Sequence, residues 1–216
     1  MSLFKFLKYR IKYKKNSGNQ IIIHKKDGKI IRNPFFLKVI KVFFYGKNST
    51  LELYEPYELK GSIFRLFNGD HFIIKENVQG VISVTGGLNS VLQIGKGSTL
   101  CNGQFFLNDE ENASIILGKD CMLSLNVFMW ASDTHQILEK DSKNILNRAS
   151  QGIKLGDHCW IGHRVSILKG VHLASNTIVG GGSVVTRSCK KPNCAIAGNP
   201  ARVIKENIVW KREGFY

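Results

Sequence analysis

The sequence predicts an all-β protein whose body is a parallel β-helix, and two periodic features lead to this prediction. From Leu155 onward a branched aliphatic residue stands at every sixth position: Leu155, Ile161, Ile167, Leu173, Val179 and Val185. The fifth position of each hexapeptide is small or β-branched: Cys159, Val165, Val171, Thr177, Ser183 and Cys189. An α-helix repeats about every 3.6 residues and a simple strand about every two. A repeat of six with two inward positions instead fits short flat strands joined by turns around a triangular prism.

The repeat is looser upstream, where only two further hexapeptides fit it, IGKGST from Ile94 and LGKDCM from Leu117. Alternating apolar segments with frequent Gly and Asn fill residues 63–112, and irregular early coils are expected there. Residues 61–199 are therefore assigned to a β-helix domain. Residues 136–152 break the pattern, and a long insertion in a solenoid maps to a loop that projects from one edge, often the functional one.

The chain before residue 61 is expected to form a basic N-terminal extension, residues 1–60. The 216 residues carry a formal charge of +15, but residues 1–50 hold 13 Lys and Arg against one acid. Residues 51–216 hold 18 Lys and Arg against 15 acids. The body is thus nearly neutral, and the local excess excludes a histone-like polycation.

Three further elements are predicted outside the repeat. Residues 3–15 carry apolar and lysine side chains on opposite sides at helical spacing, which predicts an amphipathic helix. The segment IIIHKKDGKIIRN is typical of a β-hairpin that turns at Asp27-Gly28. At the other end, Pro200 closes the repeat, and residues 200–216 are expected to form a short helix and tail.

The cysteines and the hydropathy indicate where the protein is found. No stretch approaches the ~20 apolar residues that span a bilayer. The five cysteines form no CxxC pair, which indicates reduced thiols in a cytoplasmic protein rather than a disulfide framework or a zinc site. Cys121, Cys159 and Cys189 fall on inward positions of the repeat, where they are expected to fill the core.

An ordered set of motifs points to a known family. SDTHQI (residues 132–137) is followed by GDHCWIG, IVGGGSVVT and AIAGNPARVIK, and these resemble the hexapeptide-repeat O-acetyltransferases of the maltose and galactoside type. With KENIVW near the C-terminus, the sequence is especially similar to the capsular polysaccharide (polysialic acid) O-acetyltransferases. The resemblance covers about residues 90–212. It implies a left-handed parallel β-helix, although general topology rules favour right-handed crossovers.

The resemblance also implies an activity. Members of this family transfer acetyl from acetyl-CoA directly to a sugar hydroxyl, as homotrimers with each active site between adjacent subunits. The expectation is an acetyl-CoA-dependent O-acetyltransferase acting on a capsular or other cell-surface polysaccharide, with sialic-acid-containing polymers among the candidates. No metal is expected, and no nucleic acid partner, because zinc-finger spacing and RNP-like aromatic motifs are missing from the sequence.

Three residues are the candidates for catalysis. His135 is the expected general base, because an imidazole titrates near neutral pH and can accept the proton of the attacking hydroxyl; the alternative is an exposed loop histidine. The family usually has proline after this histidine, and here it is Gln136. Asp133 either orients the ring, contacts a substrate hydroxyl or is a solvated turn residue. Trp160 matches the family's active-site tryptophan, whose indole N–H can donate to the thioester or the acceptor; alternatively it packs against a neighbouring subunit.

Further residues align with the binding positions of the family. Those that match the pantetheine and thioester contacts of acetyl-CoA are Trp160, His163, Gly181, Thr186 and Arg187. Those that match the cations near the nucleotide phosphates are Arg202 and Lys205, which could equally be solvated surface charges. Those that match the acceptor site are Asn102, Gln104 and Asn112.

Three alternative functions stay open. A β-helix carbonic anhydrase is suggested by the spacing of His158 and His163, but position 168, where that family needs a second ligand, is leucine. An N-acetyltransferase acting on a nucleotide-linked amino sugar would share the fold and the histidine, but would form an alkali-stable amide instead of an alkali-labile ester. The third is a non-catalytic β-helix binding or assembly protein.

Two hypotheses account for the basic segment at residues 1–16. It could make peripheral contact with the anionic inner membrane, where lipid-linked glycans are assembled. It could instead attract an anionic polymer such as polysialic acid, with a strong dependence on salt.

Overall fold

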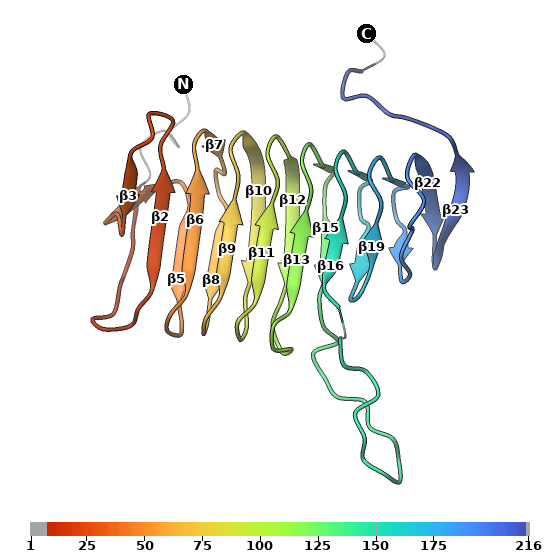
Figure 1. The fold of residues 1–216 in the computed structure, drawn as a ribbon, viewed down its shortest axis with the longest axis horizontal. Helices are drawn as coiled ribbons and strands as arrows, with labels where there is room; N and C mark the ends of the chain where they lie inside the picture. The colour runs from red at the N-terminus through yellow and green to blue at the C-terminus, as the bar shows by residue number, and fades with distance from the viewer. Residues whose placement is uncertain (1–7, 150, 215–216) are drawn as a thin grey trace.

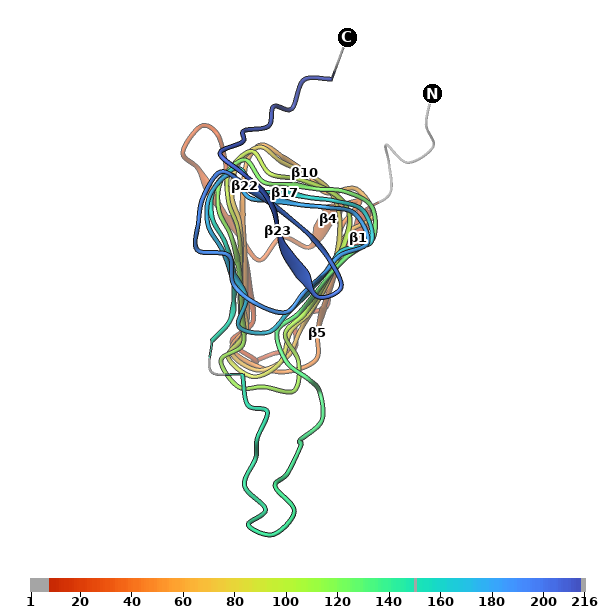
Figure 2. The same cartoon turned by 90° about the vertical axis from the view of Figure 1, so that its right-hand side faces the viewer.

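The computed structural model describes residues 8–149 and 151–214, and within these ranges the chain forms strands and turns but no helix (Figure 1). No helix that could cross a membrane is therefore present in the described part of the chain. The strands stack along one long axis, and a view down this axis shows a roughly triangular cross-section (Figure 2). Most stacked neighbours pair in parallel, so the all-β, parallel β-helix predicted from the repeat is confirmed.

The three walls of the prism are called faces 1, 2 and 3. Face 1 is an eight-stranded sheet in the order β19-β16-β13-β11-β9-β6-β2-β3. Its strands are β2 Gln20–His24, β3 Ile30–Arg32, β6 Thr50–Tyr54, β9 His71–Ile74, β11 Val91–Ile94, β13 Ser114–Leu117, β16 Ile153–Leu155 and β19 His172–Leu173. Only β3 is antiparallel to its neighbour, and it forms the hairpin predicted around Asp27-Gly28 with β2.

Faces 2 and 3 belong to one 13-stranded sheet, because β10 (Val78–Thr85) and β12 (Thr99–Phe106) continue from one face to the other. Face 2 holds the first residues of these two strands with β7 Tyr57–Glu58, β14 Met122–Leu123, β17 Trp160–Ile161, β20 Ile178–Val179, β22 Cys194–Gly198 and β23 Ala201–Glu206. Face 3 holds their last residues with β5 Lys41–Phe44, β8 Ile63–Leu66, β15 Val127–Trp130, β18 Ser166–Leu168 and β21 Val184–Val185.

Three corners connect the three faces. The loop corner, between faces 3 and 1, includes residues 131–152, 169–171 and 186–188. The strap corner, between faces 1 and 2, includes residues 118–121 and 156–159. The third corner, between faces 2 and 3, includes residues 162–165 and 180–183.

The early coils are regular in their pairing but longer than the late ones. Paired residues on face 1 stand 21 positions apart for Thr50 and His71, 20 for His71 and Val91, and 18 for Lys154 and His172. The extra residues enlarge the turns, so the hexapeptide pattern fades there although the strands persist. The irregularity expected between residues 63 and 112 is present in the coil lengths and in a bulge of β10 between Val81 and Ile82, although parallel strands form there.

The inward positions of the repeat form the core. All twelve residues at the first and fifth positions of the hexapeptides from Leu155 to Cys189 are at most 7% exposed. The three inward cysteines are buried as expected, and the longer early coils are filled by larger side chains, Phe64, Phe72 and Phe105. Burying such side chains is the main source of stability for a solenoid, because each coil buries its apolar positions only against its neighbours.

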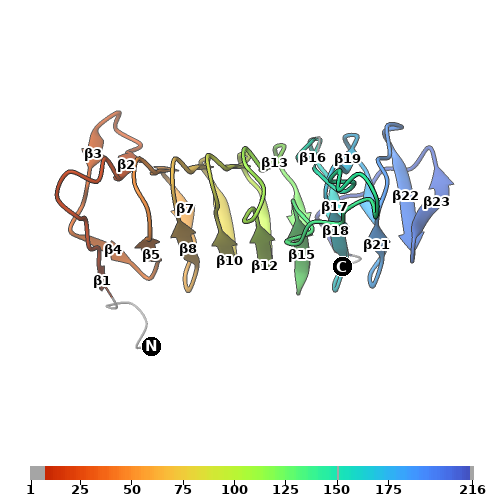
Figure 3. The same ribbon diagram turned by 90° about the horizontal axis from the view of Figure 1, so that it is seen from below.

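The basic N-terminal segment belongs to this solenoid and is not a separate extension. β2 pairs in parallel with β6, so the β-helix begins at residue 20 and not at residue 61. β1 (Lys8–Arg10) pairs antiparallel with β4 (Phe36–Lys38) at the N-terminal end of the prism (Figure 3). Ile11, Leu37 and Ile40 are buried there, and they close the core where a stack of coils would otherwise expose it.

The amphipathic helix expected over residues 3–15 is wrong for residues 8–15, which form β1 and an irregular segment. Residues 1–7 lie outside the described residues. The physical reason is that Ile11 is needed to cap the core, and its amide N–H donates to the carbonyl of Phe35 at 3.0 Å. Tertiary burial of this kind outweighs local helix propensity.

The helix expected within residues 200–216 is also wrong. β22 and β23 form an antiparallel hairpin that closes the C-terminal end of the stack. The edge of β22 carries unpaired backbone groups, and a strand satisfies them where a helix would leave them exposed. Residues 207–214 then run along the outside of the strap corner and are called the strap.

The long insertion is the most conspicuous departure from the prism. Residues 131–152 connect β15 with β16 and project from the loop corner as an arm (Figure 1, Figure 2). An antiparallel bridge between Leu138 and Ile145 narrows the arm. The insertion predicted at residues 136–152 is thus present and begins a few residues earlier than expected.

Candidate active site

His135 lies at the base of the arm, where a strained turn sets its direction. Its amide N–H donates to the carbonyl of Asp133 at 2.7 Å, and Thr134 between them has a φ of 66°. A hydrogen bond across one residue of positive φ defines a γ-turn of the rare and strained kind. Positive φ is also unfavourable for a β-branched residue such as threonine. Strain of this kind persists only where the surroundings hold it, and it clusters at functional sites.

A hydrogen-bond network holds this turn in place. The Nδ2 atom of Asn147 donates to Asp133 Oδ2 at 2.9 Å and to the carbonyl of His135 at 2.8 Å. The ammonium of Lys169, from the next coil, donates to the same carboxylate and to the carbonyl of Asn147. The hydrogen bond from Lys169 is the main reason that the pKa of Asp133 lies below its ordinary value. Asp133 thus ties the two ends of the arm to the body.

This network bears on the role of Asp133, for which orienting the ring of His135 was one of three alternatives. Among the described residues none hydrogen-bonds to the ring of His135, and the Asp133 carboxylate is directed to Asn147 and Lys169 instead. The expected alternative that Asp133 orients the ring has no supporting contact. Its geometry is that of a residue that fixes the loop, and the ring of His135 is left accessible for a substrate.

One cleft is lined by His135, and a second is lined by the turn before it. One, of about 50 Å³, is lined by Asp109, Glu110, Asp133, Thr134, His135, Gln136, Ile145, Asn147 and Arg148. The other, of about 300 Å³, is lined by Trp130, Ser132, Asp133, Thr134 and Leu168. The ring of Trp130 stacks on Phe106 at 4.0 Å between centroids and gives the second cleft an apolar wall. Polar groups beside an apolar wall are typical of small-molecule sites.

Trp160 lies in a different part of the chain's surface. It is on β17 of face 2, and this face is opposite the corner from which the arm projects (Figure 2). Its side chain is 36% exposed and leans on Trp210, with 5.8 Å between ring centroids. Neither cleft at His135 is lined by Trp160. A single chain therefore does not bring these two candidate residues together.

The residues that align with the acetyl-CoA-binding positions of the family also lie on different parts of the surface. At the third corner the ring of His163 lies over Gly181, so that an added Cβ on Gly181 would be 2.7 Å from His163 Cε1. Thr186 and Arg187 are exposed at the loop corner, two coils beyond the turn that holds His135. The remaining two positions, Arg202 and Lys205, are exposed on β23.

The three positions aligned with the acceptor are not brought together. Asn102 is exposed near the third corner and donates to Asn126 at 3.0 Å, whereas Gln104 points outward from face 3. Asn112 is exposed at the loop corner, in the coil before His135. Of these residues only Asn112 shares a corner with the histidine.

Sequence reasoning missed several residues beside His135. Asn147, Lys169 and Trp130 contribute to the turn or its clefts, and Glu110 pairs with Arg148 at 3.5 Å near the same site. Lys169 is the third residue of the ordinary hexapeptide ILKGVH, and nothing in its sequence context marks it. The arm residues belong to a segment without repeat, so only the folded arm brings them to the histidine.

Comparisons with known proteins agree with this picture. Residues 152–187 match the family model of the bacterial transferase hexapeptide (six repeats). The chain is 38% identical over 158 residues to a polysialic acid O-acetyltransferase of Neisseria meningitidis, covering 73% of this chain and 70% of that protein. It is 36% identical over 135 residues to a polysialic acid O-acetyltransferase of Escherichia coli O1:K1, covering 62% of this chain but only 42% of that longer protein.

A solved structure extends the likeness to almost the whole chain. The crystal structure of the polySia-specific acetyltransferase NeuO superposes with a TM-score of 0.74 at 31% identity, covering 92% of this chain and 87% of that one. The likeness confirms the left-handed form of the β-helix and includes the N-terminal coils that lay outside the motif resemblance. The chain therefore belongs to the family of hexapeptide-repeat acetyltransferases that contains the polysialic acid O-acetyltransferases.

Proposed function

We propose that this protein transfers the acetyl group of acetyl-CoA to a sugar hydroxyl of a capsular or other cell-surface polysaccharide. The observation that carries the proposal is His135, held by a strained turn and an ion-paired loop beside a small cleft, in a chain that belongs to this family. The polysaccharide class is supported by the relatives, which are named for polysialic acid. The charges at the smaller cleft are mixed, because Asp109, Glu110 and Asp133 face Arg148 and Lys169. The cleft therefore presents both signs of charge to an acceptor.

The chemistry assigned to His135 is general base and then general acid. Acetyl-CoA supplies a thioester whose C–S bond breaks as the new C–O bond to the sugar forms. The imidazole of His135 takes the proton of the attacking hydroxyl and returns it to the leaving sulfur, so the residue ends unchanged. Such proton transfer typically contributes about 10²–10⁴-fold in rate.

We propose that two subunits build each active site. His135, Thr186 and Arg187 lie at the loop corner, whereas Trp160, His163 and Gly181 lie on face 2 and the third corner. A groove between adjacent subunits of a homotrimer would have the first set on one wall and the second on the other. The arm supports this arrangement, because its exposed apolar side chains Ile137, Leu138 and Leu146 project away from their own body, where a second copy could cover them.

The proposed groove has a chemistry suited to acetyl-CoA. Flat strands and turns offer backbone N–H and C=O groups to the amide-rich pantetheine arm. Arg187, Arg202 and Lys205 are exposed cations toward the C-terminal end, where phosphates would be neutralised. Asp133 is proposed to act on the reaction through the loop and not by contact with the ring.

Product analysis tests the proposed activity. Purified protein is incubated with acetyl-CoA and either a sialic-acid-containing or a neutral capsular polysaccharide, and both CoA release and glycan mass are measured. We expect an alkali-labile acetyl group on the glycan, and a loss of about 10²–10⁴-fold in His135→Ala. His172→Ala, one coil beyond and on face 1, is the matched control. An alkali-stable product, or full transfer by His135→Ala, would overturn the proposal.

Subunit complementation tests the shared site. His135→Ala and Trp160→Ala are each expected to be weakly active, because each damages one wall of every groove. When both variants are coexpressed, random mixing leaves about one site in four with both residues intact, so up to about a quarter of wild-type activity should return. No recovery in mixed oligomers of confirmed composition would contradict a site between subunits.

We also propose a cytoplasmic protein that makes peripheral contact with anionic membranes through its N-terminal end. Strand β3 and the chain from Phe35 into β4 expose four large apolar side chains, Ile30, Ile31, Phe35 and Phe36. Exposed cations surround them: Lys26, Lys29, Arg32 and Lys38. We assign the membrane contact to this patch, because residues 8–15 form β1 and an irregular segment and not the expected helix. Apolar side chains among cations suit a bilayer interface better than a sugar polymer, which offers no apolar layer.

Liposome sedimentation tests this contact. Wild-type protein is expected to sediment with vesicles containing anionic lipid and not with neutral ones, and the double variant Phe35→Ser/Phe36→Ser to remain in the supernatant. Equal behaviour of the two proteins would reject the membrane contact. If the double variant instead changes the oligomeric state by light scattering, the patch is a contact between copies of this chain.

A further inference from the structure

The strap, which begins within the KENIVW motif, makes a set of contacts that the motif alone did not predict. After β23 it runs back across the stacked turns of the strap corner, in the direction of the N-terminus. The amide of Ile208 donates to the carbonyl of Asn193 at 3.0 Å, and Arg212 reaches the carbonyl of Cys121 at 3.1 Å, three turns of the corner further back. The strap therefore crosses several coils and passes beside Trp160.

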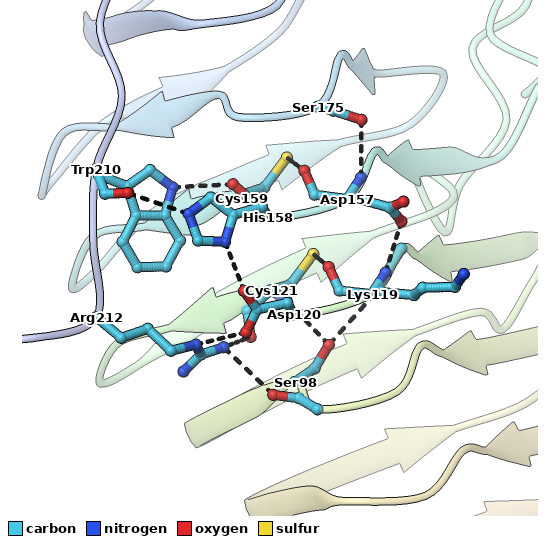
Figure 4. Close-up of polar contacts among 12 residues, drawn as sticks. Ser98, Lys119, Asp120, Cys121, Asp157, His158, Cys159, Ser175, Trp210 and Arg212 are labelled. Atoms are coloured by element: carbon cyan, nitrogen blue, oxygen red, sulfur yellow. Dashed lines mark hydrogen bonds and ion pairs between the residues drawn. The ribbon is translucent and has the colours of Figure 1, made fainter.

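His158 is the residue to which the strap is fastened. Its Nδ1 lies 2.6 Å from Asp120 Oδ2 and its Nε2 lies 3.1 Å from the carbonyl oxygen of Trp210 (Figure 4). Both partners are acceptors, so only an imidazolium can donate both hydrogen bonds. The ring also stacks on the Trp210 indole at 4.1 Å between centroids, and the indole N–H donates to the carbonyl of His158 at 2.9 Å.

Asp120 closes the network onto the strap. Arg212 Nε donates to Asp120 Oδ1 at 2.6 Å, so the chain of contacts starts at Arg212, passes through Asp120 and His158, and returns to the strap at Trp210 (Figure 4). Burial opposes the charge of Asp120, but the hydrogen bonds from His158 and Arg212 outweigh it and hold its pKa below the ordinary value. A closed network of charged hydrogen bonds is more rigid than separate pairs.

The identity of His158 is unusual for its place in the fold. Each stacked turn of this corner has one residue at positive φ, a conformation that favours Asn, Asp and Gly. At the other turns that residue is Asn77, Gly97, Asp120, Asn176 and Asn193, whereas His158 has a φ of 54°. Asparagine would satisfy the backbone equally well, so the imidazole is explained by the contacts that its ring makes.

The network ends against Trp160. Trp210 is 7% exposed and held on three sides, and its ring meets that of Trp160 at 5.8 Å with 43° between the planes. Trp160 stands on a flat strand between Met122 and Ile178, its neighbours in the sheet. Trp210 provides the contact between the strap and the indole of Trp160. Removing it would leave that side of the Trp160 indole without support from the strap.

We propose that Trp210 is the positioning residue of Trp160, and that His158, Asp120 and Arg212 hold it for that purpose. The proposal rests on the proposed function, in which Trp160 lies on one wall of the shared groove, and it assigns to the Trp160 indole N–H a hydrogen bond to the reacting groups. A fixed indole presents that donor in one direction, and a loosened one would misplace it by an ångström or more. Misplacement on this scale can lower catalysis by up to about 10²-fold.

The principal variant is His158→Asn, which keeps the backbone preference of the turn and removes the ring. We expect kcat to fall about 10- to 100-fold, with a smaller change in KM for acetyl-CoA and with the thermal unfolding midpoint nearly unchanged. Trp210→Phe keeps an aromatic ring against Trp160 and should retain most of the activity. Lys211→Ala, on the same strap but exposed, is the matched control and should behave as wild type.

A double-mutant cycle separates positioning from a merely structural role. If His158 acts through Trp160, then His158→Asn should cost little further activity in a Trp160→Phe background. If the two losses multiply independently, the strap does not act through Trp160 and the proposal is wrong.

A readout independent of activity keeps the proposal testable if the substrate is wrong. Labelling with 5-fluorotryptophan gives one NMR signal for each of the three tryptophans. The Trp160 signal should shift or sharpen in His158→Asn and stay unchanged in Lys211→Ala. An unmoved Trp160 signal defeats the strap proposal, whereas a wild-type enzyme that consumes no acetyl-CoA defeats the proposed function and leaves the strap result standing.

Discussion

At the scale of single residues, His135 takes its position from the residue before it. The γ-turn at Thr134 directs the histidine out of the loop corner, and Asp133, Asn147 and Lys169 hold that turn. The turn stores conformational free energy that a relaxed loop would release. Stability and activity are therefore expected to respond in opposite directions when Thr134 is changed.

Thr134→Gly tests this opposition. Glycine removes a strain of about 1–3 kcal/mol, but its greater freedom in the unfolded chain costs about 0.5–1 kcal/mol. We expect the free energy of unfolding to stay equal or rise slightly, while kcat falls because His135 is held less firmly. Urea unfolding and acetyl-transfer kinetics measure the two quantities. Thr134→Val keeps the strain and loses the hydroxyl, so an equal loss of activity in that variant would contradict this explanation.

The ion pair of Asp133 with Lys169 gives a pH dependence with a definite sign. The pKa of Asp133 in the folded state lies below the ordinary value of ~3.9 for aspartate. The stabilisation is therefore complete above about pH 4 and is lost as the pH falls through the lowered folded-state value. Because the carboxylate is 40% exposed, the contribution is at most about 1 kcal/mol.

Comparison of wild type with Asp133→Asn checks this sign. The difference in the free energy of unfolding should be present at pH 7 and should shrink as the pH falls through the lowered folded-state pKa of Asp133. Lys169→Gln should produce the same pattern, because it removes the other half of the pair. If the difference in the free energy of unfolding grew as the pH fell, the pKa of Asp133 would be raised and not lowered in the folded state.

At the scale of elements, the corners decide which side chains meet, and the third corner gives a test. Gly181 lies under the ring of His163, and an added Cβ would come within 2.7 Å of that ring. Gly181→Ala should displace the ring and raise KM for acetyl-CoA severalfold, with little effect on folding. In a His163→Ala background the same change should have almost no effect, since no ring is left to displace. A rise in KM of equal size in both backgrounds would show that Gly181→Ala does not act through the ring of His163.

At the scale of the whole molecule, the N-terminal segment has two tasks that its composition alone cannot separate. It carries most of the excess positive charge, and it also closes the end of the core through Ile11, Leu37 and Ile40. Deleting the N-terminal segment would therefore remove its excess positive charge and the apolar cap of the core together. Point variants distinguish the two tasks.

Ile11→Ala should lower the free energy of unfolding by about 2–4 kcal/mol, because it opens a cavity at the end of the solenoid. Lys12→Gln, at an exposed neighbouring position, should change it by no more than about 0.5 kcal/mol. Thermal or urea unfolding monitored by circular dichroism measures both. If Lys12→Gln were as destabilising as Ile11→Ala, the cap would depend on charge and not on packing.

The late coils and the catalytic candidate could be predicted because they depend on short-range pattern. A six-residue period needs only side-chain size at two positions, and residues from Leu155 to Cys189 satisfy it without a gap. The SDTH motif identified His135 before any coordinates. The early coils could not be recognised as readily, because turns of variable length destroy the period while the backbone pairing continues.

The sequence by itself determined the parallel β-helix, its inward residues, the position of the arm and the candidate histidine. Only the tertiary structure decided that the basic N-terminus caps the core, that the C-terminal segment is a hairpin followed by a strap, and that His135 and Trp160 lie on opposite sides of one chain. The physical reason is that these outcomes depend on which edges and apolar surfaces remain uncovered after the coils have stacked. Free strand edges, open core ends and stacked turns arise only in the assembled prism, where residues as distant as Asp120 and Arg212 come into contact.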